Sequence, residues 1–494
     1  MKPIRLLITY LFLCTTGISA SESTLREVPS RCDASWLTTH LEHRLPCYLL
    51  KEEPESGWKI IRNTFQIVNV GGQDRDVSIL HADLSSLSWE PDPQYAPDSP
   101  LWQHRLTIYK PETVISDRAL LVINGGINHP RESGQQHHQG DAIDFARIAA
   151  RTQSIVINLK DIPNQYLKFP HSSHLREDNL VSFSWGQFLV KPEPDSSWPL
   201  HMPMAKAVIA AMDAIETILA IHDITINGFV LEGGSKRGWT ASLTASQDKR
   251  VTAIIPMVAD FLNLGEMIKH LLNVYPEGNP AVSAYLHLPL RDTSSESEMQ
   301  QLIAMIDPFQ YRDALSMPKY IVSASGDEFM PPDNSKLSFG ELPGKKWMRV
   351  LPNQGHYIVR DNEDLVTDIT ESFYGAIVEG RVLPDIEWDL QGHQLTLTSS
   401  QAPKAAWLWQ ATNATDRDFR RIPSIENLSD FRRSPIHMIC QQNACKSSTD
   451  IPEPDTGWSA SFVELHFDNA PYADLVFTTR VFVQPDRYPT PSNR

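Results

Sequence analysis

The sequence predicts an α/β fold with a mostly parallel central sheet, and three observations support this prediction. From about residue 119 onward, apolar runs of strand length alternate with stretches of helical periodicity, as in a parallel sheet covered by helices on both faces. A glycine-flanked serine, Ser235, stands between one apolar run and a helix-prone stretch. After about residue 383, alternating apolar and polar residues with turn-rich links favour a small β-sandwich-like region.

The elements before the serine are assigned from their periodicity. Residues 24–60 are predicted to be a helical or irregular lead-in, and a loop rich in Pro, Asp and Ser is expected at 90–100. Strands are predicted at residues 65–70, 77–80, 105–109, 119–123 and 154–158. Helices are predicted at 141–151 and 202–221, the second with apolar residues three and four positions apart.

The elements after the serine continue the alternation, with one interruption. A helix begins at Lys236, and strands are predicted at 253–258, 320–323 and 347–351, followed by a helix at 365–378. Residues 259–316 are a mixed insert with helices expected at 262–272 and 297–306; it is interpreted as a cap over the active site, with a plain surface insert as the alternative. Strands are predicted in the β-rich tail at 394–398, 406–410, 462–467 and 475–483.

Three residues stand in the chain order of an α/β-hydrolase triad. Ser235 lies in a Gly-Gly-Ser-Lys-Arg-Gly string, typical of a nucleophile elbow, although the usual second glycine falls one place later, at Gly238. Asp327 follows the strand at 320–323, and His356 follows the strand at 347–351. We therefore predict Ser235 as nucleophile, His356 as general base and acid, and Asp327 as the residue that orients the imidazole.

Other residues are predicted to support this chemistry. The paired glycines Gly125 and Gly126 and the backbone amide of Lys236 are expected to form the oxyanion hole, with the Lys236 ammonium adding positive charge. Glu232, in the elbow strand, is interpreted as a buried polar support that could tune His356 or contact substrate. Asp260, after the preceding strand, is an alternative acid, and Glu328 and Asp333 are further competitors.

Neither a metal nor a cofactor is predicted. His137, His138 and Asp141 resemble metal ligands, but nothing else in the chain supplies a matching spacing, so a polar loop is the preferred interpretation. The formal net charge of −16 and the absence of a long basic run disfavour a nucleic-acid partner. The expected partner is a small-molecule or cell-envelope ester or peptide.

The first residues predict export to the periplasm or beyond. Lys2 and Arg5 precede a short apolar run at 6–13, and Ile18-Ser19-Ala20 offers a cleavage site, so residues 1–20 are interpreted as a signal peptide; a retained anchor is the alternative. No later segment is long enough to span a bilayer. The predicted organisation is a hydrolase domain at 21–382, including the insert, and a β-rich domain at 383–494.

Four cysteines remain after the predicted cleavage: Cys32, Cys47, Cys440 and Cys445. An even number in an exported chain indicates two disulfides, for which three pairings are possible. The local pairs Cys32–Cys47 and Cys440–Cys445 are favoured because they close small loops. Free buried thiols are the alternative.

Several strings carry a family resemblance. Residues 233–240, 198–204 leading into 211–214, 121–126 and 325–329 together resemble the PhoPQ-activated pathogenicity-related protein family of bacteria, from about residue 30 to the β-rich tail. The resemblance implies an exported α/β-hydrolase-like protein linked to PhoP–PhoQ regulation and to virulence or cationic-peptide resistance. The Ser-Lys-Arg-Gly elbow is also similar to that of glucuronoyl esterases, which implies an ester substrate.

These observations favour an exported serine hydrolase that cleaves an ester through an acyl-enzyme. A peptidase using the same three residues is the second enzyme hypothesis. A binding or signalling protein that keeps the fold without the chemistry is the third, because a fold alone does not define a function.

Overall fold

A computed structural model describes residues 24–128, 143–276, 279–288, 297–358, 363–422, 429–442 and 444–489. The predicted signal peptide at 1–20 and the loop residues His137, His138 and Asp141 lie outside these ranges. Within them, no helix combines the length and the apolar character needed to cross a bilayer.

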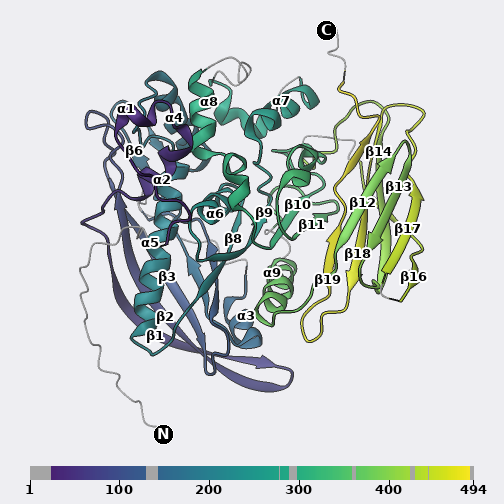
Figure 1. The fold of residues 1–494 in the computed structure, drawn as a ribbon, viewed down its shortest axis with the longest axis horizontal. Coiled ribbons are helices and arrows are strands. Elements are labelled where there is room, and N and C mark those ends of the chain that lie inside the picture. The colour runs from purple at the N-terminus through teal and green to yellow at the C-terminus, as the bar shows by residue number, and fades with distance from the viewer. Residues whose placement is uncertain are drawn as a thin grey trace.

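Parallel strands form the centre of a 14-stranded mixed sheet (Figure 1). These strands are short and almost entirely buried, as expected where helices cover both faces of a parallel sheet. In spatial order they are β5 (Val156–Leu159), β4 (Arg118–Ile123), β8 (Gly228–Gly234), β9 (Val251–Met257), β10 (Lys319–Ala324) and β11 (Lys346–Leu351).

Two layers of helices cover this centre. Successive side chains of a strand point to opposite faces, and in β4 Leu121 belongs to one apolar cluster while Leu120 belongs to another. The first cluster contains side chains of α5 (His201–Ala220) and α6 (Lys236–Gln247). The second contains side chains of α3 (Phe145–Thr152) and α9 (Glu363–Val378).

An antiparallel ribbon extends one edge of the sheet. It consists of β1 (Gly57–Val70), β2 (Gln73–Ser88) and β3 (Leu101–Pro111), drawn in purple and blue in Figure 1. These strands are longer than the predicted ones. Most of β1 is exposed, with Phe65 at 73% exposure, so its sequence lacks the alternation that burial of one face would impose.

The C-terminal strands extend the opposite edge. β19 (Leu475–Thr478) pairs with β11, and the order continues through β18 (Trp458–Phe467), β14 (Ala405–Asn413) and β15 (Arg432–Pro435). β20 (Phe482–Gln484) pairs with β18, so the single strand predicted at 475–483 is two strands. A second sheet contains β12 (Ile386–Gln391), β13 (Gln394–Ser399), β17 (Ala444–Asp450) and β16 (Ile439–Gln441).

The segment between β9 and β10 carries the predicted helices of the insert. They are α7 (Leu264–Val274) and α8 (Ser297–Ile306), accompanied by the 3₁₀ turns η2 (Pro280–Tyr285) and η4 (Pro308–Ala314). One neighbouring helix, α4 (Glu177–Val190), was not predicted. Its apolar residues are spread around the helix instead of lying on one face, which removes the periodic signal.

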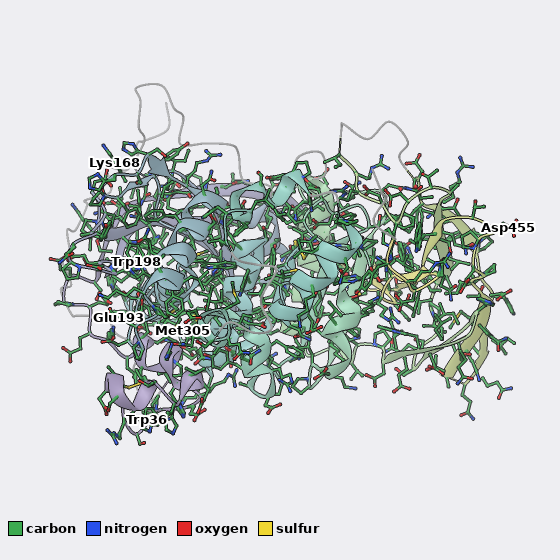
Figure 2. The ribbon with its side chains drawn as sticks, turned by 90° about the horizontal axis from the view of Figure 1, so that it is seen from above. Trp36, Lys168, Glu193, Trp198, Met305 and Asp455 are labelled. Atoms are coloured by element: carbon green, nitrogen blue, oxygen red, sulfur yellow. A yellow bond between two sulfur atoms is a disulfide. The ribbon has the colours of Figure 1, made fainter. Side chains whose placement is uncertain are left out.

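Both favoured disulfides are present. Cys32–Cys47 ties together the short helices α1 (Ala34–Leu37), η1 (Leu41–His43) and α2 (Arg44–Leu49). Cys440–Cys445 joins directly paired residues of β16 and β17. Figure 2 shows Trp36 of the first region and Asp455 of the C-terminal region far apart in the molecule. The remaining elements are β6 (Leu167–Lys168), β7 (His174–Leu175), η5 (Asn334–Leu337) and η6 (Phe339–Glu341).

Candidate active site

Ser235 stands at the sharp turn between β8 and α6. Its backbone has φ 56° and ψ −129°, a region that residues with a Cβ rarely occupy. The Ser235 amide donates a hydrogen bond to the carbonyl of Met257 at 2.8 Å, which ties the turn to the neighbouring strand. The turn therefore presents the Ser235 hydroxyl beyond the carboxyl edge of the sheet.

The glycines of the motif are required by close backbone approach. A Cβ on Gly233 would lie 2.6 Å from the carbonyl oxygen of Arg237, and a Cβ on Gly238 would lie 2.5 Å from the carbonyl oxygen of Gly233. Both distances are too short for real carbon atoms. Gly238, which stands one place later than the usual second glycine, thus allows the close contact between α6 and β8. Position 237 therefore does not need a glycine and carries an arginine.

Three side chains from separate strand ends form one hydrogen-bonded chain. His356 Nε2 lies 2.8 Å from Ser235 Oγ, and His356 Nδ1 lies 2.9 Å from Asp327 Oδ2. Asp327 and His356 are buried, with 4% and 5% exposure. These distances suit proton transfer from a hydroxyl to an imidazole that a carboxylate holds in one tautomer.

The loops that bear Asp327 and His356 also hold each other. Asp327 Oδ1 accepts a hydrogen bond from the Phe329 amide at 2.8 Å, and Glu328 Oε2 accepts one from the His356 amide at 2.7 Å. The Phe329 ring packs on the imidazole, with ring centroids 4.3 Å apart. Glu328, a competing acid in the sequence, thus binds the His356 backbone instead of its ring.

The other two candidate acids lie in different surroundings. Asp260 Oδ1 accepts a hydrogen bond from Ser338 at 3.4 Å, and its backbone carbonyl accepts one from Asn334. Burial raises the pKa of Asp260 to about 6. Asp333 is buried against His270 and Arg417, which lower its pKa against the effect of burial.

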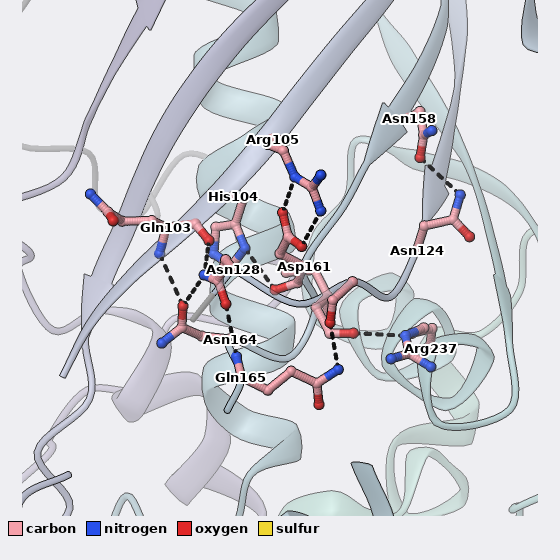
Figure 3. A network of polar contacts seen from close by, with 12 residues as sticks. Gln103, His104, Arg105, Asn124, Asn128, Asn158, Asp161, Asn164, Gln165 and Arg237 are labelled. Atoms are coloured by element: carbon pink, nitrogen blue, oxygen red, sulfur yellow. Dashed lines mark hydrogen bonds and ion pairs between the residues drawn. The ribbon is translucent and has the colours of Figure 1, made fainter. Parts of the chain in front are cut away.

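The loop with Gly125 and Gly126 borders the same cleft as Ser235, Lys236 and His356. Figure 3 shows the polar network that holds this loop. Arg105 makes two hydrogen bonds to Asp161, at 2.7 and 2.6 Å, and Gln165 Nε2 donates to the Gly126 carbonyl at 2.6 Å. A Cβ on Gly126 would overlap the Asp161 carboxylate, so only glycine fits there.

A charge cluster that the sequence did not indicate lies beside Ser235. Glu177, at the start of α4, pairs with Lys236 Nζ at 2.8 Å and with Arg237 Nη2 at 2.6 Å, and Asp178 lies 3.3 Å from Lys236 Nζ. Burial alone would raise the pKa of Glu177, but Arg237 and Lys236 outweigh it and hold the pKa well below its usual range. The Lys236 ammonium, expected at the oxyanion, is engaged in this cluster.

Arg237 connects the cluster to the glycine loop. Its Nε donates to the Ile162 carbonyl at 2.7 Å, and a Cβ on Gly125 would meet its guanidinium. Lys236 is the first residue of α6, so its backbone amide has no carbonyl partner within the helix. Positive charge from the helix dipole is concentrated at this end, close to Ser235.

Glu232 occupies the face of β8 that is covered by α9. It is 2% exposed, and its Oε1 accepts a hydrogen bond from Thr370 at 3.1 Å. Oε2 has no hydrogen-bond partner among the described residues. Burial raises the pKa of Glu232 to about 8, so the side chain is mainly a neutral acid at pH 7. Within the described ranges, no group of three or more His, Cys, Asp or Glu side chains could hold a metal ion.

The parallel centre, the two helical layers and the elbow after β8 define the chain as an α/β-hydrolase-fold protein. It belongs to the PhoPQ-activated pathogenicity-related protein family, whose model matches residues 45–420. A relative named autocrine proliferation repressor protein A, from Dictyostelium discoideum, is 29% identical over 428 residues, covering 82% of this chain and 85% of the relative.

Solved structures with some likeness include two esterases. Acetyl xylan esterase 1 from Thermoanaerobacterium is 13% identical, with a TM-score of 0.40 over 72% of this chain and 100% of that one. The glucuronoyl esterase from Solibacter usitatus is 14% identical, with a TM-score of 0.35 over 69% of this chain and 93% of that one.

Proposed function

We propose that the protein is a serine hydrolase that cleaves esters through an acyl-enzyme. The hydrogen-bonded chain from Ser235 Oγ through His356 to Asp327 is the observation that supports this proposal most directly. The strained backbone at Ser235 adds support, because residues held in rare backbone conformations cluster at active sites.

In the proposed reaction, Ser235 Oγ attacks the substrate carbonyl carbon while His356 Nε2 takes the hydroxyl proton. Asp327 stabilises the imidazolium that results. The negative oxygen of the tetrahedral intermediate accepts hydrogen bonds from the Lys236 amide and from the loop at Gly125 and Gly126. The imidazolium then protonates the leaving alcohol, and a water molecule, activated by His356, releases the acid and restores Ser235.

The charges around Ser235 favour an ester over a peptide with a free amino terminus. Glu177 and Asp178 are the carboxylates that could bind an ammonium group beside the nucleophile, but both face the Lys236 ammonium, and Glu177 also binds Arg237. A second ammonium would compete with these ion pairs. A peptidase using the same three residues is the alternative enzyme.

A specific observation also supports a non-catalytic alternative. The Dictyostelium discoideum relative is named for repressing proliferation, and this chain covers 85% of it. A signalling protein of that kind could retain the fold and dispense with turnover. Under this alternative, Ser235→Ala would keep the biological effect.

We propose export to the periplasm or the exterior as the setting. The two disulfides support an oxidising compartment, and the predicted signal peptide at 1–20 supports translocation. The family description adds the expectation of a role in pathogenicity under PhoP–PhoQ control.

The decisive experiment is labelling of the purified chain with a fluorophosphonate, followed by peptide mapping and hydrolysis of a panel of ester and peptide substrates. We expect labelling at Ser235, at least 1,000-fold slower in His356→Ala because the hydroxyl loses its base. Ester turnover should disappear in Ser235→Ala while the circular dichroism spectrum is unchanged. Folded protein that neither labels nor hydrolyses any ester would contradict the proposal.

A further inference from the structure

A pocket with apolar walls opens next to Ser235. The aromatic rings of Trp185 (α4), Trp239 (α6) and Phe261 line it together with aliphatic side chains of α7, and Ser235 and Lys236 also border it. Its volume is about 80 Å³, well above the roughly 10–15 Å³ that a single water molecule needs.

The polar groups at this pocket leave no unpaired charge for a ligand. The Lys236 ammonium faces Glu177 and Asp178, and the Tyr285 hydroxyl donates to Asp178 at 3.0 Å. His201 packs on Trp239, with ring centroids 4.0 Å apart, and burial lowers its pKa to about 3, so the imidazole is neutral. Neither ring nitrogen of His201 has a hydrogen-bond partner among the described residues, so the pocket favours an uncharged group that is apolar except where it meets this imidazole.

A neighbouring cleft that shares Ser235 with this pocket has both polar and apolar walls. This cleft is bordered by His356, by the glycine loop and by Gln165, Arg176 and Glu177. Among the described residues, His356 lines the cleft and not the apolar pocket. A general acid must reach the leaving oxygen, so the leaving alcohol lies in the cleft. The acyl group then points into the apolar pocket.

From this arrangement we infer that the substrate is an ester whose apolar acyl group binds in the pocket and whose alcohol lies in the cleft. The inference rests on the proposed hydrolase function and adds the substrate class and its orientation. Burial of acyl methylenes in the pocket raises kcat/KM, and the residues of α7 determine the length that fits.

The test compares two isomers, ethyl hexanoate and hexyl acetate, which share one composition and differ in which side of the ester is apolar. We expect ethyl hexanoate to be hydrolysed at least tenfold faster. In a series of ethyl esters from acetate upward, kcat/KM should rise about fourfold for each methylene, or about 0.8 kcal/mol, and level off once the acyl chain fills the pocket.

Two variants of Leu272, a partly buried lining residue of α7, test the pocket itself. Leu272→Trp should reduce the ratio of hexanoate to acetate turnover at least tenfold, and Leu272→Ala should shift the optimum to longer chains. The control is Val190→Trp, at an 85% exposed position of α4 outside the pocket lining, which should keep the wild-type ratio.

Fluorophosphonate labelling of each variant distinguishes failure of the inference about the acyl pocket from failure of the proposed hydrolase function. Preference for hexyl acetate, or a chain-length profile that both Leu272 variants leave unchanged, would overturn the inference while Ser235 still labels. Absence of labelling in the wild-type chain would instead reject the hydrolase function on which the inference rests.

Discussion

Two residues at this site, Ser235 and Glu232, are held in states that are costly elsewhere in a protein. Ser235 has a positive φ, and Glu232 is a buried carboxylic acid with one oxygen that meets no hydrogen-bond partner in the described part of the chain. A backbone conformation such as that of Ser235 costs about 1–3 kcal/mol and persists only where the surroundings enforce it. Here the Met257 carbonyl and the glycines at 233 and 238 enforce the turn.

Because Glu232 is buried, we predict that the free energy of unfolding depends measurably on pH. Its pKa is raised by burial from 4.5 to about 8, so between these values the folded state keeps a proton that the unfolded state has released. The free energy of unfolding should therefore fall as pH rises, by up to about 1.4 kcal/mol per pH unit.

The measurement is guanidinium unfolding of the wild type and Glu232→Gln at pH 5 and pH 7.5. The neutral glutamine removes this contribution, so the variant should gain stability relative to the wild type as pH rises. Thr370→Val, which removes the hydrogen-bond donor and keeps the carboxyl, serves as the control. An equal pH dependence in wild type and Glu232→Gln would show that Glu232 is not held neutral.

At the scale of elements, α4 contributes to the site through its first turn. Glu177 anchors Lys236 and Arg237 of α6, and Arg237 in turn bonds the Ile162 carbonyl beside the glycine loop. Helices α6 and α4 and the loop at Gly125 and Gly126 therefore form one connected unit. A change at Glu177 should reach the glycine loop without touching Ser235.

Glu177→Gln is predicted to weaken both stability and turnover. Loss of the negative charge leaves two partly buried cations without full compensation, at an expected cost of about 2–3 kcal/mol in unfolding free energy. A fall in kcat of about tenfold or more, with a small change in KM, would reflect a less ordered oxyanion loop.

The matched control is Glu193→Gln, which breaks the exposed Lys191–Glu193 pair just beyond α4. Exposed pairs contribute about 0–1 kcal/mol, so this variant should resemble the wild type in both guanidinium unfolding and kinetics. Equal behaviour of the two variants would contradict the role assigned to Glu177.

What the sequence could predict depends on how local each signal is. The central strands and α5 carry strong periodicity, and Ser235, Asp327 and His356 each follow a strand, so the places of these residues in the fold were predictable from their neighbours. Glu177 lies about 60 residues from Lys236 in the chain, and no local pattern links them. α4 also lacks an apolar stripe, so neither the helix nor its contact with Lys236 was predicted.

At the scale of the whole molecule, the C-terminal strands are joined to the hydrolase centre. The Tyr320 hydroxyl donates to the Val476 carbonyl at 2.7 Å, and the Thr478 hydroxyl accepts from the Val350 amide at 3.0 Å. Farther along, the Arg421 amide donates to the carbonyl of Gly326, next to Asp327. The C-terminal region thus supports both the sheet edge at β11 and the loop that bears Asp327.

A chain that ends at residue 382 is therefore predicted not to fold into an active protein. Loss of residues 383–494 would expose the edge of β11 and the apolar cluster that contains Tyr320, Trp347 and Phe477. We expect insoluble expression or loss of near-ultraviolet circular dichroism, and a single calorimetric unfolding transition for the full chain.

The double variant Cys440→Ser/Cys445→Ser is the control: opening this short loop should cost about 2 kcal/mol and leave a folded, fluorophosphonate-reactive protein. A soluble 382-residue chain that still labels at Ser235 would show that the C-terminal strands are an independent domain.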